Sequence, residues 1–205
     1  MIMYILFTSL FAYVLSVVLP FAYQWQKKKV IESCKELVNE ADDEIGHFPF
    51  LSLLVISIAS LIYYLSSDFI LFVFCCCLAI VAYIDACKRW IPDQMIYLLI
   101  TISVYSLGSR DLTMSLIAVS FYITPVALLS VYGYLVKRES WIASGDYYVF
   151  PSIGLMLTPD YAAGVMLTTL FAMLILTRWV RKIPLITVAY FTFTGFKVCS
   201  ILGIL

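Results

Sequence analysis

The sequence contains few charged residues. They make up 13% of the chain, about half their usual share in soluble domains, whereas hydrophobic residues make up 63%. The formal net charge is zero and there is no long basic tract, which excludes nucleic-acid binding through a basic surface. This composition predicts an all-α polytopic membrane protein. Its 205 residues have room for seven or eight spans of about 20 residues, so any domain outside the bilayer must be small.

Metal-ligating residues are also scarce. The chain has one histidine and six cysteines, and no two cysteines are spaced as C-x-x-C. Three adjacent cysteines at 75–77 lie inside an apolar run, where cysteine packs as a small apolar residue. A zinc site built from Cys34, His47 and Cys87 would lack recognisable ligand spacing. We therefore expect no metal site, and His47 has no evident partners for a catalytic triad.

Apolar runs predict eight membrane helices. Residues 1–23 lack both the basic start and the cleavage site of a secretory signal, so we expect a retained first span with its N-terminus outside. Residues 24–47 predict a short cytoplasmic polar loop, solvated or forming a surface amphipathic helix. Residues 48–205 predict a membrane-embedded domain. Its helices are expected at 48–66, 69–86, 94–108, 112–136, 147–157, 161–177 and 185–205, of which 147–157 is too short to span alone.

Several aspartates are predicted to start helices. Asp68, Asp111 and Asp160 fall in the predicted outside turns, and each is expected to cap the helix that follows. Asp93 follows Pro92 directly, which is typical of a helix start. These four acids therefore have structural explanations.

Basic residues test the predicted topology independently. With the N-terminus outside, the inside connections are 24–47, 87–93, 137–146 and 178–184, and they hold eleven of the thirteen basic residues. Only Arg110 and Lys197 lie elsewhere. One span more or fewer would place many of these basic residues outside, so the positive-inside rule supports eight spans. The same parity predicts that Asp85 and Asp146 lie at one cytoplasmic face.

Asp85 and Asp146 are the acids that need an explanation, because each stands at the end of an apolar segment. An ionised carboxylate drawn into the bilayer costs several kcal/mol. Asp85 has a structural alternative as the ion-pair partner of Lys88 or Arg89. Asp146 could serve as an ordinary helix-start acid. Taken alone, each acid fits its structural interpretation better.

Taken together, the two acids predict peptide hydrolysis. Two carboxylates a few ångströms apart cannot both ionise cheaply, so they share one proton. The ionised acid then deprotonates a water molecule, while the protonated acid donates to the scissile carbonyl. This chemistry needs neither a metal nor a nucleophilic side chain.

The motifs around these acids resemble the bacterial type IV prepilin peptidases, which are GxGD-type intramembrane aspartyl proteases. In that family one catalytic Asp stands shortly before an Ile-Pro-Asp/Asn element, as Asp85 does before Ile-Pro92-Asp93. The other closes a Gly-x-Gly-Asp motif, as in Ala143-Ser144-Gly145-Asp146. The sequence Arg-Lys-Ile-Pro at 181–184 is similar to the family's entry to its last span, and the resemblance covers roughly residues 70–200.

This resemblance implies a function and site residues. Asp85 and Asp146 would form the catalytic pair. Supporting residues would be Pro92, Asp93, Ala143, Ser144 and Gly145, with Gly145 letting the backbone pack closely. Substrates would be prepilins or pseudopilins in the bacterial inner membrane, cut at their short basic leader. The acids Glu40, Asp42, Asp43 and Glu44 are candidate leader contacts.

The chain also departs from the family pattern. Ala143 replaces the first Gly of Gly-x-Gly-Asp, and Tyr148 stands where many members have Lys. The first inside loop lacks the paired Cys-x-x-Cys elements of members that also N-methylate the new terminus. The peptidase reaction needs no cofactor, and S-adenosylmethionine would be needed only if methyltransferase activity is retained.

Other functions stay open at this stage. The same two acids could serve a small proton- or cation-coupled transporter, although the two halves show no convincing internal repeat. A non-catalytic membrane subunit of a pilus or secretion assembly is a second alternative, and an archaeal preflagellin peptidase is the nearest one within the superfamily. The sequence predicts the lipid bilayer as a partner and does not specify the oligomeric state.

Overall fold

The chain is all-helical in the computed structural model, which describes residues 2–33, 48–88, 91–138, 142, 144–178 and 183–204. These ranges contain eight α-helices and no strand, in agreement with the predicted fold class. The helices are α1 (Ile2–Ser33), α2 (Pro49–Ser66), α3 (Phe69–Lys88), α4 (Asp93–Ser106), α5 (Leu112–Lys137), α6 (Ser144–Leu155), α7 (Pro159–Leu176) and α8 (Leu185–Ile201). A 3-10 turn, η2 (Leu107–Ser109), follows α4.

Five of the described helices are long and apolar enough to cross a membrane, namely α1, α2, α3, α5 and α7. These lengths and compositions are those of a multi-pass membrane protein. The helices α4, α6 and α8 are shorter, with 14, 12 and 17 residues. At about 1.5 Å per residue, α6 is only about 18 Å long, against a hydrocarbon core of roughly 30 Å. It cannot span the bilayer alone.

The short helix α6 lies inside the bundle, where it packs against α4, α5 and α8. Phe150 and Ile153 of α6 are fully buried. The ring of Phe150 also meets the ring of Tyr122 on α5 edge to face, with 6.1 Å between centroids. Because α6 is surrounded by protein rather than lipid, a helix shorter than the bilayer is tolerated there.

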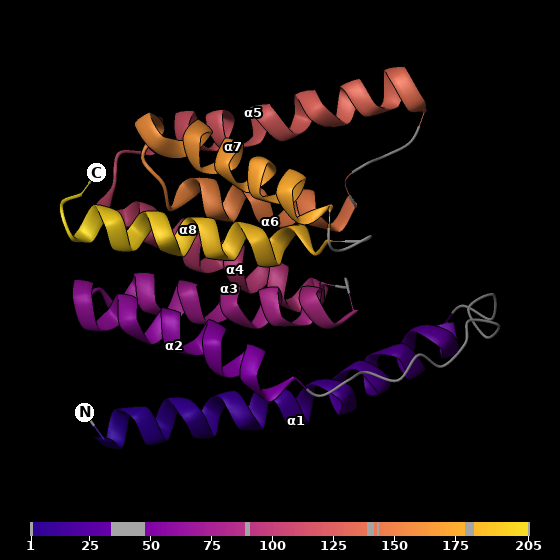
Figure 1. Ribbon diagram of the computed structural model, residues 1–205, viewed down its shortest axis with the longest axis vertical. Helices are drawn as coiled ribbons and strands as arrows, with labels where there is room; N and C mark the ends of the chain where they lie inside the picture. Colours follow the sequence, from indigo (N-terminus) through magenta and orange to yellow (C-terminus); the bar gives the residue numbers. More distant parts are fainter. Residues whose placement is uncertain are drawn as a thin grey trace.

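Successive helices run in alternating directions, so their ends collect at two ends of the bundle (Figure 1). The C-terminal end of α3 and the N-terminal ends of α4, α6 and α8 lie together at the right-hand end in Figure 1. Both termini of the chain lie at the opposite end. The segments that carry Asp85 and Asp146 therefore share one end of the bundle.

The first helix is attached to the bundle mainly through α2. The Ser52 hydroxyl of α2 donates to the Ala12 carbonyl of α1 at 2.6 Å. The buried Tyr83 hydroxyl of α3 donates to Ser16 Oγ at 3.2 Å and accepts the Phe48 N–H at 3.4 Å. Polar groups inside an apolar bundle thus satisfy one another, which fixes α1 against α2 and α3.

The structure corrects one predicted boundary and leaves another untested. The first helix continues past Tyr23 to Ser33, although its apolar window ends at Trp25. Residues 24–33 are therefore helical, which the surface-helix alternative allowed and the solvated-loop interpretation did not. Lys, Gln and Glu dominate this extension and are good helix formers, so leaving the apolar region does not end the helix. The rest of the predicted loop, 34–47, lies outside the described residues.

Two of the three predicted caps are confirmed. Asp68 accepts two backbone N–H groups of the first turn of α3, at 2.9 and 3.0 Å. Asp111 accepts the Thr113 N–H at 2.8 Å at the start of α5. The prediction for Asp160 is wrong, because Thr158 is the N-cap of α7 and Asp160 lies in its first turn. There it still interacts favourably with the positive end of the helix dipole.

Candidate functional site

Asp85 is held inside the bundle by the start of another helix. It lies in the last turn of α3, and only 3% of its surface is exposed. Its Oδ2 atom accepts the backbone N–H of Thr187 at 3.1 Å and lies 3.3 Å from the Thr187 hydroxyl. A buried carboxylate needs such partners, because one left without them costs several kcal/mol.

The sequence at the start of α8 explains why these donors are available. Pro184 is the N-cap of α8, and its side chain offers no hydrogen bond to the first turn. The N–H groups of a first helical turn have no partner inside their own helix. Thr187 is the third residue of α8, so Asp85 accepts one of these free N–H groups and acts as a cap supplied by α3. The positive end of the α8 dipole also favours an ionised carboxylate there.

Thr187 is a site residue that the sequence interpretation missed. The Ile-Pro pair at 183–184 predicted the start of α8. It did not predict the group that accepts the Thr187 N–H, since Asp85 lies 102 positions earlier in the chain. Only the packing of α3 against α8 brings the two residues together.

Asp146 lies in the first turn of α6 and is 7% exposed. The helix begins at Ser144, earlier than residue 147, so Asp146 belongs to the helix rather than to the turn before it. Its carboxylate is therefore close to the N-terminal end of its own helix, where negative charge is favoured. Both predicted catalytic acids are buried, and their helices both pack against α8.

The two sequence motifs meet in the structure. A methyl group added to Gly145 would have Ile91 Cδ1 as its nearest described neighbour, at 4.0 Å. The segment before α4 thus lies beside the start of α6. Pro92 is buried as the N-cap of α4, while Asp93 is exposed at the first position of that helix, in keeping with its predicted role at a helix start. The 4.0 Å separation would admit a methyl group, so the described neighbours of Gly145 do not show the predicted close backbone packing.

Other predicted site residues lie outside the described residues. These are the candidate leader contacts Glu40, Asp42, Asp43 and Glu44, together with Ala143; the side chain of Ser144 is also not described. Cys34 and His47, two of the three conceivable zinc ligands, are likewise outside the described ranges. Among residues that are described, no group of three or more His, Cys, Asp or Glu side chains could hold a metal ion.

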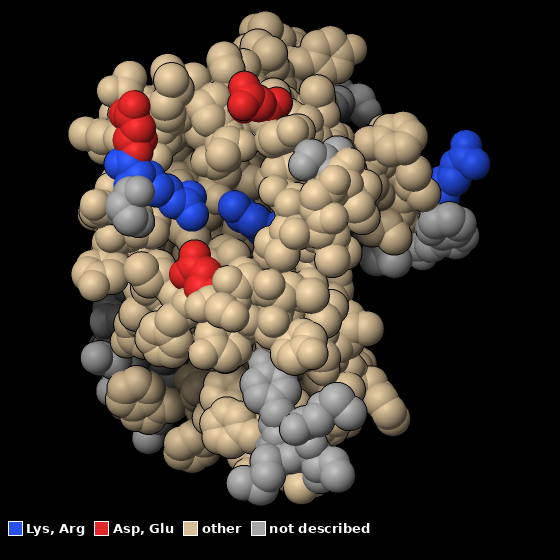
Figure 2. Space-filling model, turned by 90° about the vertical axis from the view of Figure 1, so that its left-hand side faces the viewer, with Lys and Arg blue, Asp and Glu red and all other residues tan. Residues whose placement is uncertain are grey.

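A charged hollow lies at the opposite end of the bundle, the face turned to the viewer in Figure 2. Basic side chains border it, with acidic side chains nearby (Figure 2). Arg110, Asp111 and Lys197 line this hollow of about 310 Å³, so the two exceptions to the charge bias share one location. Asp111 is engaged there as the cap of α5, and Lys197 lies over the Phe193 ring at 5.6 Å. The hollow does not contain the buried acids Asp85 and Asp146.

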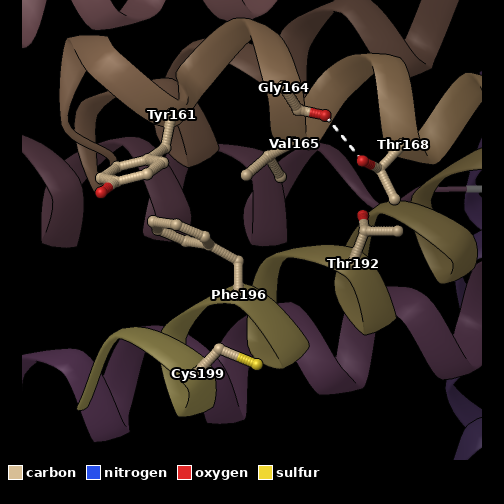
Figure 3. Close-up of a pocket in the computed structure, with 7 residues that line it drawn as sticks. All are labelled: Tyr161, Gly164, Val165, Thr168, Thr192, Phe196 and Cys199. Carbon is tan, nitrogen blue, oxygen red and sulfur yellow. Dashed lines mark hydrogen bonds between the residues drawn. The ribbon is translucent and has the colours of Figure 1, made fainter. Parts of the chain in front are cut away.

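A second hollow, of about 320 Å³, lies between α7 and α8 (Figure 3). The Tyr161 and Phe196 rings pack against each other at one side of it, tilted by 43° with 5.0 Å between centroids. The Thr168 hydroxyl donates to the Gly164 carbonyl of its own helix at 2.8 Å. The Thr192 hydroxyl of α8 forms a hydrogen bond with the Thr169 hydroxyl of α7 at 2.6 Å. The described residues that line this hollow include no charged side chain.

Comparison with known proteins identifies one family. A model described as the type IV leader peptidase family matches residues 72–179, just over half of the chain. The matched range contains both Asp85 and Asp146 and ends before α8. No curated protein and no solved structure matches the chain.

Proposed function

Because the chain belongs to the type IV leader peptidase family, we propose that it is an aspartyl endopeptidase that removes the basic leader from type IV prepilins or pseudopilins. One observation carries the proposal: two buried acids, Asp85 and Asp146, stand at the same end of the bundle inside the matched range. Burying an acid inside a membrane protein costs free energy, so such acids are rare and usually mark a functional site. A shared proton is the chemistry that such a pair provides.

The reaction follows from that shared proton. The ionised carboxylate takes a proton from water while the water oxygen attacks the scissile carbonyl carbon. The protonated carboxyl donates its proton to the carbonyl oxygen, which gives a neutral tetrahedral intermediate. When the C–N bond breaks, the acid that is now protonated gives its proton to the departing amine, and the acid that is now ionised takes a hydroxyl proton from the intermediate, so the pair returns to its starting state. No cofactor is required for this cycle, and S-adenosylmethionine would serve only a retained N-methyltransferase activity.

The proposed setting is the bacterial cytoplasmic membrane. Eight helices would cross or enter the bilayer, with the first starting outside and the acid pair at the cytoplasmic face. The distribution of basic residues supports this orientation. The basic leader of the substrate would then approach the connection at 24–47, where Glu40, Asp42, Asp43 and Glu44 offer negative charge. The following residues, 48–205, would form the membrane-embedded peptidase domain.

A cleavage assay tests the proposal. Purified protein in detergent is incubated with a full-length prepilin, and the product is identified by mass spectrometry. We expect a product shortened by its leader, and we expect Asp85→Ala and Asp146→Ala each to abolish it. The exposed acid Asp160, at the far end of the bundle, provides the control, because Asp160→Ala should leave cleavage intact.

The alternative outcome is equally concrete. If the wild-type protein yields no shortened prepilin, and reconstituted vesicles show proton or cation flux that depends on Asp85 and Asp146, the acids serve transport instead. Cleavage that persists in both alanine variants would also overturn the proposal.

A further inference from the structure

We propose that Thr187 is a positioning residue for Asp85, whose hydroxyl gives the carboxyl group a partner in both of its protonation states. The inference rests on the proposed function, because it concerns the acid that would exchange a proton with water. Thr187 lies beyond the residues matched by the family model, so the match assigns it no role.

The hydroxyl of Thr187 stands between two acceptors on α3. It lies 2.7 Å from the Ala82 carbonyl oxygen and 3.3 Å from Asp85 Oδ2. A hydroxyl has one hydrogen and two lone pairs, whereas a carbonyl oxygen can only accept. The shorter contact is therefore the donated one, from Thr187 to Ala82. The lone pairs of Oγ1 are then available on the side of Asp85.

This arrangement suits an acid that changes its protonation state. When Asp85 carries the proton, Thr187 Oγ1 can accept it while donating to Ala82. When Asp85 is ionised, rotation of the hydroxyl can turn its hydrogen toward Oδ2. The Thr187 N–H, at 3.1 Å, can only donate, so it stabilises the ionised state more than the protonated state. Of the two Thr187 groups, the hydroxyl is thus the one that serves both states.

Ala82 fixes the position of the hydroxyl. It lies three residues before Asp85 on the same helix, and it is fully buried. A threonine anchored to the Ala82 carbonyl holds Oδ2 at a fixed place relative to α3 itself. Thr187 is 7% exposed, so water has little access to replace its hydroxyl. The proposed role is to orient Asp85 for proton exchange with the attacking water or the scissile carbonyl.

Three variants separate this role from packing. Thr187→Val keeps the shape and the backbone N–H and removes only the hydroxyl. Thr187→Ser restores the hydroxyl without the methyl group. Thr194→Val is the matched control on the same helix, because among the described residues the buried Thr194 hydroxyl bonds only to α8 carbonyls, at 2.7 and 3.2 Å.

The measurement is the cleavage of a full-length prepilin by the purified full-length protein, with kcat and KM determined separately. We expect Thr187→Val to lower kcat about 10- to 100-fold, the effect of losing a hydrogen bond to a charged group, with KM unchanged. Thr187→Ser should recover most of the wild-type kcat, and Thr194→Val should retain it. Thermal unfolding of each variant verifies that it is folded.

Two results would overturn the role of Thr187. One is a wild-type kcat in Thr187→Val, and the other is a kcat in Thr187→Ser as low as in Thr187→Val, which would assign the effect to the methyl group. Either result leaves the proposed function standing if the two aspartate variants remain inactive. Absence of cleavage by the wild-type protein would instead overturn the proposed function.

Discussion

Gly154 of α6 lies so close to Val119 of α5 that an added Cβ atom would be 2.8 Å from the Val119 Cα atom. Real Cβ atoms essentially never approach another heavy atom this closely, and here the neighbour is backbone rather than a flexible side chain. The glycine therefore sets the distance between α5 and α6. Because α6 carries Asp146 in its first turn, this contact also determines where that acid lies.

We predict that Gly154→Ala pushes α6 away from α5. Overpacking of this kind costs about 1–3 kcal/mol, so the free energy of unfolding in detergent should fall by that amount. The rate of prepilin cleavage should fall too, since Asp146 moves with α6. Gly195→Ala is the control, because a Cβ added there would meet no described atom within 4 Å outside its own stretch of helix, and alanine favours the helix. Equal stability of the two variants would contradict the tight α5–α6 contact.

A pair of buried tyrosines gives a second prediction. The Tyr122 hydroxyl has no hydrogen-bond partner among the described residues, whereas the Tyr190 hydroxyl donates to the Val55 carbonyl at 2.5 Å. Tyr122→Phe removes an unsatisfied buried group, so the free energy of unfolding should stay the same or rise. Tyr190→Phe should lower it by about 1 kcal/mol. Equal destabilisation by both changes would show that the Tyr122 hydroxyl has a partner.

Much of this fold could be predicted from the sequence, because long apolar runs separated by polar turns locate helices directly. The caps at Asp68 and Asp111 followed from local spacing alone. The end of α1 did not, since hydropathy marks where a helix leaves the apolar region and not where its backbone hydrogen bonds stop. Ser33 lies well beyond Trp25 for that reason.

The site was harder to predict than the helices. Motif order singled out Asp85 and Asp146, and their burial at one end of the bundle agrees with a shared site. Which helix starts beside Asp85 depends on how apolar helices pack, and apolar faces resemble one another in sequence. The contact between Thr187 and Asp85 therefore could not be predicted from the sequence. Gly154 likewise looked like any other glycine in an apolar run.

The Tyr83 hydroxyl of α3 leads to a third prediction, about the local stability of the start of α2. Tyr83→Phe removes the acceptor of the Phe48 N–H and the donor to Ser16. Amide hydrogen exchange at Phe48 should become faster, because its N–H loses this partner. Tyr63→Phe on the exposed side of α2 is the control and should leave that exchange rate unchanged. An unaltered rate in Tyr83→Phe would mean that another group protects the Phe48 amide.

The last prediction concerns orientation in the membrane, on which the proposed cleavage depends. Asp160 and Thr177 stand at opposite ends of α7, and both are exposed. In a background without the natural cysteines, Asp160→Cys should react with a membrane-impermeant maleimide in intact cells. Thr177→Cys lies at the end of the bundle that holds Asp85 and Asp146, so it should react only after the membrane is permeabilised.

Labelling after permeabilisation is the control for thiol reactivity, because both cysteines should then be labelled fully. Labelling of Thr177→Cys in intact cells, with Asp160→Cys protected, would place the buried acids at the outer face. A prepilin carries its basic leader on the cytoplasmic side of its apolar helix, so acids at the outer face could not reach the bond to be cut. That result would remove the leader-peptidase proposal even with Asp85 and Asp146 buried as they are.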